Sequence, residues 1–427
     1  MDEKAFYITT PKKDQRQDQN LGRNSFKADA DYAIDIIKWL LKPLGLWPKT
    51  LNTTCFEKMT AIFLMSICTF LLAFLIVPGS LFTFVKIKNP AVRLKLTGPL
   101  SFCVMGIMKY YSLAAERHNI ANCIRHMTAD WQKIVSTRDR AIMLAYAQFG
   151  RYGATICTGF MYSGALFYAV ILPYVSTGAK NEANVTIRSL AYPSYYVLFD
   201  PQESPAYELV FSTHCLCAFV MHSITSATCS LAVVFAMHAC GQLEILIMWL
   251  NDLVDGGGDK HRRDDDADER FSEIIDQHVR TLSFIIRAEG VLREICLVEI
   301  CGCTLNICFI GYYLMMEWAQ ADAMGMTTYT ILLISFVFNI FLFCYVGELL
   351  TEECKKVGQT TYMMEWYRLP EKKALGLTLV ISTAQHPVTI TAGGMIALSL
   401  SSFCALLHIS IFCEHSWIEI ETRLICK

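Results

Sequence analysis

Charged residues are scarce in this 427-residue chain: they make up 18% of it, against about 25% in soluble globular domains. Hydrophobic residues reach 54%, above the roughly 45–50% of soluble domains. The charge is also balanced, with 37 basic and 39 acidic residues, which excludes a strong electrostatic attraction to nucleic acid. So few polar residues cannot cover about three soluble domains, the number that the length alone would predict. The composition predicts an all-α, polytopic membrane protein whose surface faces lipid.

Motifs for catalysis and metal binding are missing as well. The sequence contains no P-loop, no GxGxxG, no GxSxG and no HExxH. Its 18 cysteines include no CxxC pair, and most of them lie inside apolar runs, where thiols usually pack as small buried hydrophobes. We therefore expect no enzyme, no cofactor and no metal site.

Seven segments are apolar enough to cross a bilayer, which needs about 20 mostly apolar residues. They are Ala61–Val77, Leu96–Leu113, Gly153–Val175, Tyr207–Cys240, Ile295–Met316, Tyr329–Gly347 and Val388–Cys413. The second carries Lys109, which we expect to extend its ammonium group towards the membrane interface. Asp31–Pro48 is too short and too charged to cross, so it predicts an interfacial helix, and the polar residues 1–30 are expected to be weakly ordered.

Positive charge predicts the orientation. With a cytosolic N-terminus, the cytosolic segments hold 24 Lys and Arg residues and the outer segments hold 8. Basic residues collect on the cytosolic side, so we expect a cytosolic N-terminus and, after seven spans, an extracellular C-terminus. In this topology the sequon at Asn184 lies outside and is the predicted glycosylation site, whereas the sequon at Asn52 is cytosolic.

Helical patterns continue beyond the membrane in three cytosolic stems, over residues 241–254, 271–297 and 348–370. The middle stem carries an amphipathic stripe in which apolar residues step by four, three and four: Ile275, Val279, Leu282 and Ile286. Such stems pack within one chain or bind neighbouring subunits, and the pattern alone favours neither.

Short motifs follow one another in the last quarter of the chain. They are Tyr362-Met-Met-Glu-Trp366, Leu369-Pro370, Gln385-His386-Pro387, Thr391-Ala392-Gly393-Gly394, Ser399-Leu400, Phe403 and Leu406-Leu407. In this order, and together with the seven spans and the cytosolic stems, they resemble the C-terminal region of insect odorant receptors. The resemblance covers the whole chain in architecture and residues 345–412 in motif.

The resemblance implies a ligand-tuning subunit of an odorant-gated, non-selective cation channel. Such a subunit forms a hetero-tetramer with a shared odorant co-receptor in the plasma membrane of the sensory neuron dendrite. The seventh helix lines the pore, which implies pore residues Ser399, Phe403, Leu406, Ile409 and Cys413. The cytosolic ends of helices four to seven hold the subunits together, which favours the interface role of the stems and implies contacts through Ile275, Leu282, Ile286, Tyr362 and Trp366.

The family's ligand pocket lies in the outer half of the bundle, between the second, third, fourth and sixth helices. The residues that these stretches offer are Phe102, Met105, Phe160, Gly164, Phe167, Tyr168, Phe211, His214, Ala218, Tyr329 and Leu333. Aromatic and methionine walls around a small gap suit a small volatile odorant that is held by shape and dispersion, with few directed polar bonds.

This reading divides the chain into four parts: a cytosolic segment with the interfacial helix (1–55), six helices with the pocket (56–347), a cytosolic anchor helix (348–387), and the pore helix with an atypical tail (388–427). The tail departs from the family, since Glu414 stands near the place of an apolar gate and its carboxylate would wet that gate. Either residues 414–427 come from an alternative terminal exon and leave a defective gate, which the abrupt change favours, or the co-receptor subunits supply the gate.

Three other functions remain open. A gustatory receptor of the same superfamily would carry a different signature in place of Ser399–Leu407. A seven-helix G-protein-coupled receptor would have an outside N-terminus and the DRY and NPxxY motifs, which this sequence lacks. A transporter would show inverted repeats and ionisable residues at the membrane midplane, for which Glu299 in the fifth span is the nearest candidate.

Overall fold

The computed structural model describes residues 12–48, 54–134, 136–176, 188–196, 199–255, 264–320, 322–369 and 371–411. These ranges are helical apart from connecting segments and one short hairpin. The elements are α1 (Lys12–Leu41), α2 (Cys55–Leu81), η1 (Phe82–Lys86), α3 (Pro90–Ala115), α4 (Arg117–Lys133), α5 (Thr137–Leu166), η2 (Phe167–Ile171), α6 (Leu172–Ser176), α7 (Ala206–Asp255), α8 (Asp264–Gln320), α9 (Ala323–Met363), η3 (Trp366–Arg368), α10 (Glu371–Gln385), β1 (Thr391–Ala392) and β2 (Ile396–Ala397). A last, unlabelled helix covers Leu400–Ile411.

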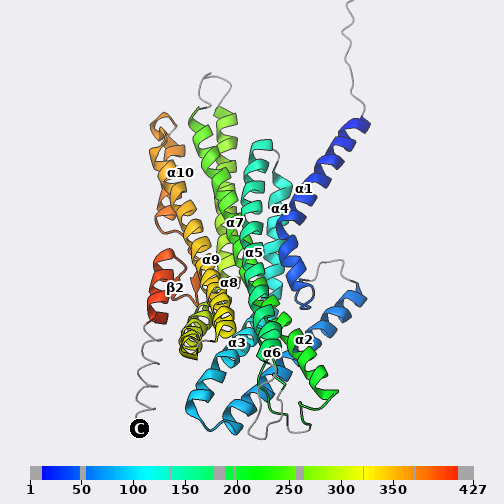
Figure 1. Ribbon diagram of the computed structural model, residues 1–427. Helices are drawn as coiled ribbons and strands as arrows, with labels where there is room; N and C mark the ends of the chain where they lie inside the picture. The colour runs from blue at the N-terminus through cyan, green and yellow to red at the C-terminus, as the bar shows by residue number, and fades with distance from the viewer. Residues whose placement is uncertain are drawn as a thin grey trace, which may run out of the picture.

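Four long helices form the body of the molecule. Figure 1 shows α5, α7, α8 and α9 running side by side, with α2 and α3 crossing near their lower ends and α1 leaning on the upper part. Helix α7 is the centre, since 89% of its apolar span is buried, against 22% of the spans in α2 and in α5. The apolar side chains that α2 and α5 leave exposed suit a surface covered by lipid. In lipid a helix is stable because its backbone N–H and C=O groups bond to one another.

Five of the described helices are long and apolar enough to cross a membrane. They are α2 with its continuation to Lys86, α5 with its continuation to Val175, α7, α8 and α9, and they contain the first, third, fourth, fifth and sixth predicted spans. The second predicted span lies within α3, which is less apolar. The chain is thus an all-helical, multi-pass membrane protein apart from its small hairpin.

The helices continue past the predicted apolar spans. Helix α7 runs unbroken for 50 residues and α8 for 57, so that each joins a span and a stem in one rod. Helix α9 ends at Met363, so the predicted anchor helix over 348–387 is divided, and α10 packs back along α9. A buried cluster ties the stems to α4, because Asp130 binds Nε2 of His238 at 2.9 Å and forms an ion pair with Arg280. Burial raises the pKa of Asp130, but His238, His126 and Arg280 together outweigh it and keep that pKa below its usual value.

The N-terminal helix begins earlier than the predicted interfacial helix. Helix α1 starts at Lys12, within the segment expected to be weakly ordered. Its apolar face is buried at Ile37, Leu40 and Leu41, and the helix packs against α4, α5 and α7. A helix of this polar composition is only marginally stable alone, and its packing against the stems stabilises it.

The seventh span begins later than predicted. We expected one helix over Val388–Cys413, but β1 and β2 form an antiparallel hairpin inside this range, and the helix begins only at Leu400. The cause is the pair Gly393 and Gly394, whose positive φ angles of 62° and 71° make a turn that other residues rarely adopt. The hairpin docks on α8, since Gly393 N–H donates to the Arg293 carbonyl at 2.9 Å. Cys413 and the tail 414–427 lie outside the described residues.

An ion pair is buried where α3 meets α8. Lys109 and Glu299 are both fully buried, and Nζ of Lys109 lies 3.0 Å from each carboxylate oxygen. Lys109 also donates to the hydroxyl of Thr225 on α7 at 2.9 Å. Glu299 accepts three further bonds, from Thr228 at 3.1 Å, Cys303 at 3.1 Å and Asn339 at 2.8 Å.

We call these six residues the Lys109–Glu299 node. The expectation that Lys109 extends to the membrane interface is wrong, because its side chain is fully buried and its Nζ lies 3.0 Å from the carboxylate of Glu299. Every charged oxygen of Glu299 has donors, which is the condition under which a buried ion pair is tolerated. The node joins α3, α7, α8 and α9 by side chains alone.

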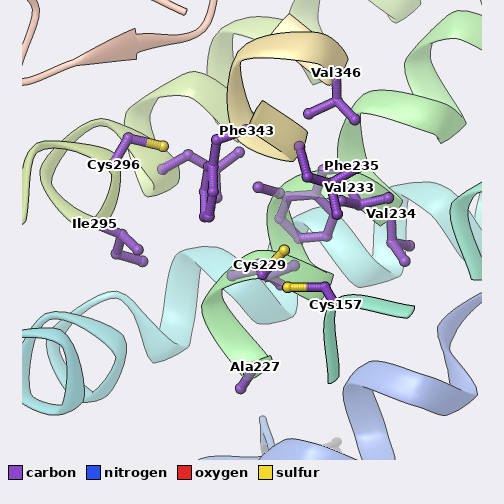
Figure 2. Packing of buried hydrophobic residues seen from close by; sticks show 14 of the residues in the cluster. Cys157, Ala227, Cys229, Val233, Val234, Phe235, Ile295, Cys296, Phe343 and Val346 are labelled. Atoms are coloured by element: carbon purple, nitrogen blue, oxygen red, sulfur yellow. The ribbon is translucent and has the colours of Figure 1, made fainter. Parts of the chain in front are cut away.

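An apolar layer surrounds the node. Figure 2 shows Cys157 of α5 and Cys229 of α7 pointing toward one another, with Val233 and Phe235 on α7 and Phe343 on α9 packed nearby. Of the sixteen cysteines within the described ranges, twelve are buried and all sixteen are free thiols. This agrees with the prediction that the cysteines serve as small packing residues.

The node gives a prediction for stability. Lys109→Met leaves Glu299 buried without its cation. We therefore expect the free energy of unfolding to fall by about 3–5 kcal/mol and the melting temperature in detergent to be clearly lower. Adding Glu299→Gln removes the unpaired charge and should recover most of this loss. Melting curves of the single and double variants test the coupling, and equal damage in both would show that the two charges do not depend on one another.

Candidate functional site

A cavity of about 310 Å³ lies among α3, α7, α8 and α9, and residues of η2 and of the segment 189–193 complete its wall. The wall is largely aromatic, through Phe102, Tyr168, Tyr192, Phe309, Tyr313, Tyr329 and Phe336. A volume of this size is enough for a small organic molecule, and such walls bind by dispersion and burial of apolar area.

The inner end of the cavity is a layer of rings. Phe102 of α3 meets Phe336 of α9 edge-on, with ring centres 5.6 Å apart, and lies 5.0 Å from the imidazole of His222. Three residues further along α7 and α9 come Thr225 and Asn339, which belong to the Lys109–Glu299 node. Residues three apart are neighbours on a helix face, so the cavity lies one turn from the node.

Some charged and polar groups of the wall are satisfied within the chain. Nζ of Lys95 lies 2.7 Å from a carboxylate oxygen of Glu317, and the lysine is half exposed while the glutamate is buried. The hydroxyl of Tyr313 accepts a hydrogen bond from Gly98 N–H at 3.1 Å and donates to the Leu94 carbonyl at 3.3 Å. Gly98 has to be small, because a Cβ there would collide with the Tyr313 ring.

Three of the eleven predicted ligand residues line this cavity: Phe102, Tyr168 and Tyr329. The other eight lie outside its wall: Met105, Phe160, Gly164, Phe167, Phe211, His214, Ala218 and Leu333. Phe160 packs on Phe338 of α9 at 5.2 Å, and His214 is bonded to the hydroxyl of Tyr196 at 3.1 Å. Phe160 and His214 therefore make packing contacts within the chain, and a direct part in ligand binding stays a prediction for all eleven residues.

The sequence reasoning missed the wall that α8 supplies. Asn306, Phe309, Ile310, Tyr313 and Glu317 all face the cavity. Their spacing of three, one, three and four residues puts them on one helix face, a signal that was readable in the fifth span. Tyr192 was also missed, and it carries no such signal because it belongs to a connecting segment without helical periodicity.

The predicted pore residues lie on or beside the last helix. Leu406 is buried, Phe403 packs edge-on against Phe341 of α9 at 5.5 Å, and Ile409 is exposed. Ser399 precedes the helix, and Cys413 lies outside the described residues. Their role in a pore stays a prediction.

The predicted interface residues differ in exposure. Ile275 and Leu282 are half-buried within the chain, whereas Ile286, Tyr362 and Trp366 are exposed. The exposed three are available to another subunit, while the half-buried two also take part in packing within the chain. Asn184, the predicted glycosylation site, is outside the described residues.

The chain is similar to known odorant receptors. The family profile described as 7tm Odorant receptor matches residues 89–411. Odorant receptor 10 of Aedes albopictus is 25% identical over 224 residues, which cover 52% of this chain and 58% of that protein. Odorant receptor 82a of Drosophila melanogaster is 24% identical over 240 residues, which cover 56% of this chain and 60% of that protein. The chain thus spans less than two thirds of the length of both relatives.

Solved structures share the fold. The insect olfactory receptor OR5 from Machilis hrabei matches with a TM-score of 0.74 and 14% identity, over 91% of this chain and 100% of that chain. The structure of the same receptor in complex with eugenol matches with a TM-score of 0.75. At this identity the likeness establishes the architecture.

Two adjacent aromatic residues allow a matched test of the cavity. Tyr168 lines it and Phe167 does not, so we expect Tyr168→Ala to change the rank order of small volatiles that stabilise the purified protein, while Phe167→Ala keeps that order. Removing a buried aromatic ring costs about 3–5 kcal/mol, so Tyr168→Phe serves as the mild variant that should stay folded. Thermal shifts across one panel measure the order, and the same reordering by both alanine variants would contradict the assignment of the cavity.

Proposed function

The chain belongs to the insect odorant receptor family, and from this premise we propose that it is the ligand-tuning subunit of an odorant-gated, non-selective cation channel formed with the odorant co-receptor. The observation that carries the proposal is the aromatic cavity of about 310 Å³, enclosed by helices that continue as cytosolic stems. A molecule in the cavity contacts the same rods that reach the proposed subunit interface.

The proposed ligand is a small volatile organic molecule. The cavity is of the right size class, and its rings offer broad apolar contact. The Machilis hrabei receptor, whose fold this chain shares, is known in complex with eugenol, a small aromatic volatile. This likeness supports a ligand of similar size in the present chain.

The proposed topology has seven spans with a cytosolic N-terminus and an extracellular C-terminus in the plasma membrane of a sensory neuron dendrite. Helix α3 supplies the second span, and the helix that begins at Leu400 supplies the seventh. The threefold excess of basic residues on the stem side supports this orientation. The co-receptor completes a hetero-tetramer around the pore.

The proposed contact with other subunits runs along the α8 stem. Val279 and Ile286 lie seven residues apart, and each is 57% exposed, so they form an apolar row on one helix face. Tyr362 and Trp366, at the end of α9 and in η3, add exposed aromatic area. Clustered apolar surface on a water-facing stem is typical of a protein interface.

Voltage clamp of oocytes tests the proposed function directly. With the odorant co-receptor, we expect volatiles to evoke a cation current whose agonist order differs from that of the co-receptor alone. The chain expressed by itself should give no such current, because the functional pore needs the partner subunits. A response that requires a G protein, or solute uptake without the co-receptor, would replace this proposal by a receptor or transporter of another class.

A single stem position tests the interface. Ile286→Lys places a charge in the apolar row, so we expect co-purification with the co-receptor to fall several-fold, since burying an unpaired ammonium group is costly. Because Ile286 is exposed in the single chain, the variant should fold normally. Glu273→Lys puts the same group at another exposed position of the stem and serves as the control, and equal losses for both would argue against this face.

A further inference from the structure

The cavity wall contains polar atoms that the protein itself does not use. Among the described residues, Nε2 of His222 and the hydroxyl groups of Tyr168, Tyr192 and Tyr329 have no hydrogen-bond partner. Other polar groups of the same wall are engaged, since Tyr313 and Asn306 bond to backbone carbonyls. A ligand therefore meets a largely aromatic wall with a few free polar atoms.

The hydrogen-bonding role of His222 follows from its surroundings. Its Nδ1 lies 2.8 Å from the carbonyl oxygen of Ala218, and a carbonyl can only accept, so Nδ1 carries the proton. The side chain is 5% exposed and no carboxylate is bonded to it within the described ranges, so the neutral imidazole is the stable form. In that form Nε2 is an acceptor, and it has no donor from the chain.

This acceptor lies beside the inner ring layer. The imidazole is 5.0 Å from the ring of Phe102, which in turn meets Phe336. A ligand that packs on these rings brings its substituents next to His222. If the ligand offers no donor, it buries Nε2 without a hydrogen bond, which is unfavourable in an apolar site.

Building on the proposed function of the cavity as an odorant site, we propose that this receptor is tuned to volatile alcohols or phenols, whose O–H donates to Nε2 of His222 while the carbon skeleton packs against Phe102 and Phe336. Shape alone would treat an alcohol and its methyl ether alike, whereas this arrangement favours the alcohol.

Matched pairs of compounds test the preference on the purified full chain in lipid nanodiscs. The pairs are para-cresol, benzyl alcohol and linalool, each with its own methyl ether. We expect each hydroxyl compound to bind about tenfold more tightly than its ether, because a hydrogen bond to an otherwise unpaired buried acceptor is worth roughly a factor of ten. Equal binding within all pairs, or no binding by any compound, overturns the inference.

Three variants assign the preference to one atom. His222→Phe keeps a ring but removes the acceptor, so the preference should disappear through weaker binding of the hydroxyl compound, with the ether unchanged or improved. His222→Gln carries an amide oxygen near the position of Nε2 and should retain part of the preference. His214→Phe changes a buried histidine of the same helix that lies outside the wall, and it should leave the preference intact. A preference that survives His222→Phe counts against the assignment.

Binding and current separate this inference from the function it rests on. Hydroxyl-selective binding without any odorant-evoked current in the presence of the co-receptor supports the His222 site and contradicts the channel proposal. Odorant-evoked current with no difference between alcohols and ethers supports the channel proposal and contradicts the role of His222.

Discussion

The buried pair of Lys109 and Glu299 is the constraint on which the arrangement of the helices depends. Each charge is tolerable only beside the other, so α3 must meet α8 at this level. The remaining lone pairs of Glu299 accept hydrogen bonds from Thr228 of α7 and Asn339 of α9. These bonds fix the rotation of both helices about their axes and their axial position relative to α8. The cavity lies one turn away on α7 and α9, so the node also determines which side chains its wall presents.

Apolar surface is concentrated on the outer helices, and polar side chains are concentrated on the central helix. The outer helices α2 and α5 carry apolar surface that needs lipid to cover it, while the central α7 is covered by protein and can hold histidines, serines and threonines. Several of its hydroxyl groups bond to its own carbonyls, as Thr213 does to Leu209 at 2.7 Å, which needs no partner helix. At the stem, Asp130 and His238 repeat on a smaller scale what the node does inside the bundle.

Hydropathy and helical periodicity were enough to predict the long helices, because runs such as Ile295–Met316 are apolar for a whole span and their amphipathic continuations follow a regular spacing. They did not predict the partner of Lys109, since Glu299 stands 190 residues away and nothing local connects the two. The hairpin was not predicted because residues 388–413 are apolar enough for a span. The signal against one continuous helix was the pair of adjacent glycines, which can reverse the chain. Three cavity residues were found where a helix face pointed inwards, whereas Tyr192 came from a segment whose position is set only by tertiary contacts.

The unbroken length of α8 has a mechanical consequence. A helix of 57 residues is about 85 Å long, and it remains one rod as long as its hydrogen bonds are continuous. A tilt of about 2° at the cavity end then displaces the far end by about 3 Å, which is comparable to the rise of two residues. A ligand therefore needs to shift the cavity wall by only a fraction of an ångström for the geometry of the stem to change by a distance that side-chain contacts can register. Helix α8 thus carries the cavity wall near one end and the long stem at the other, and a small rotation of the rod is amplified along the stem.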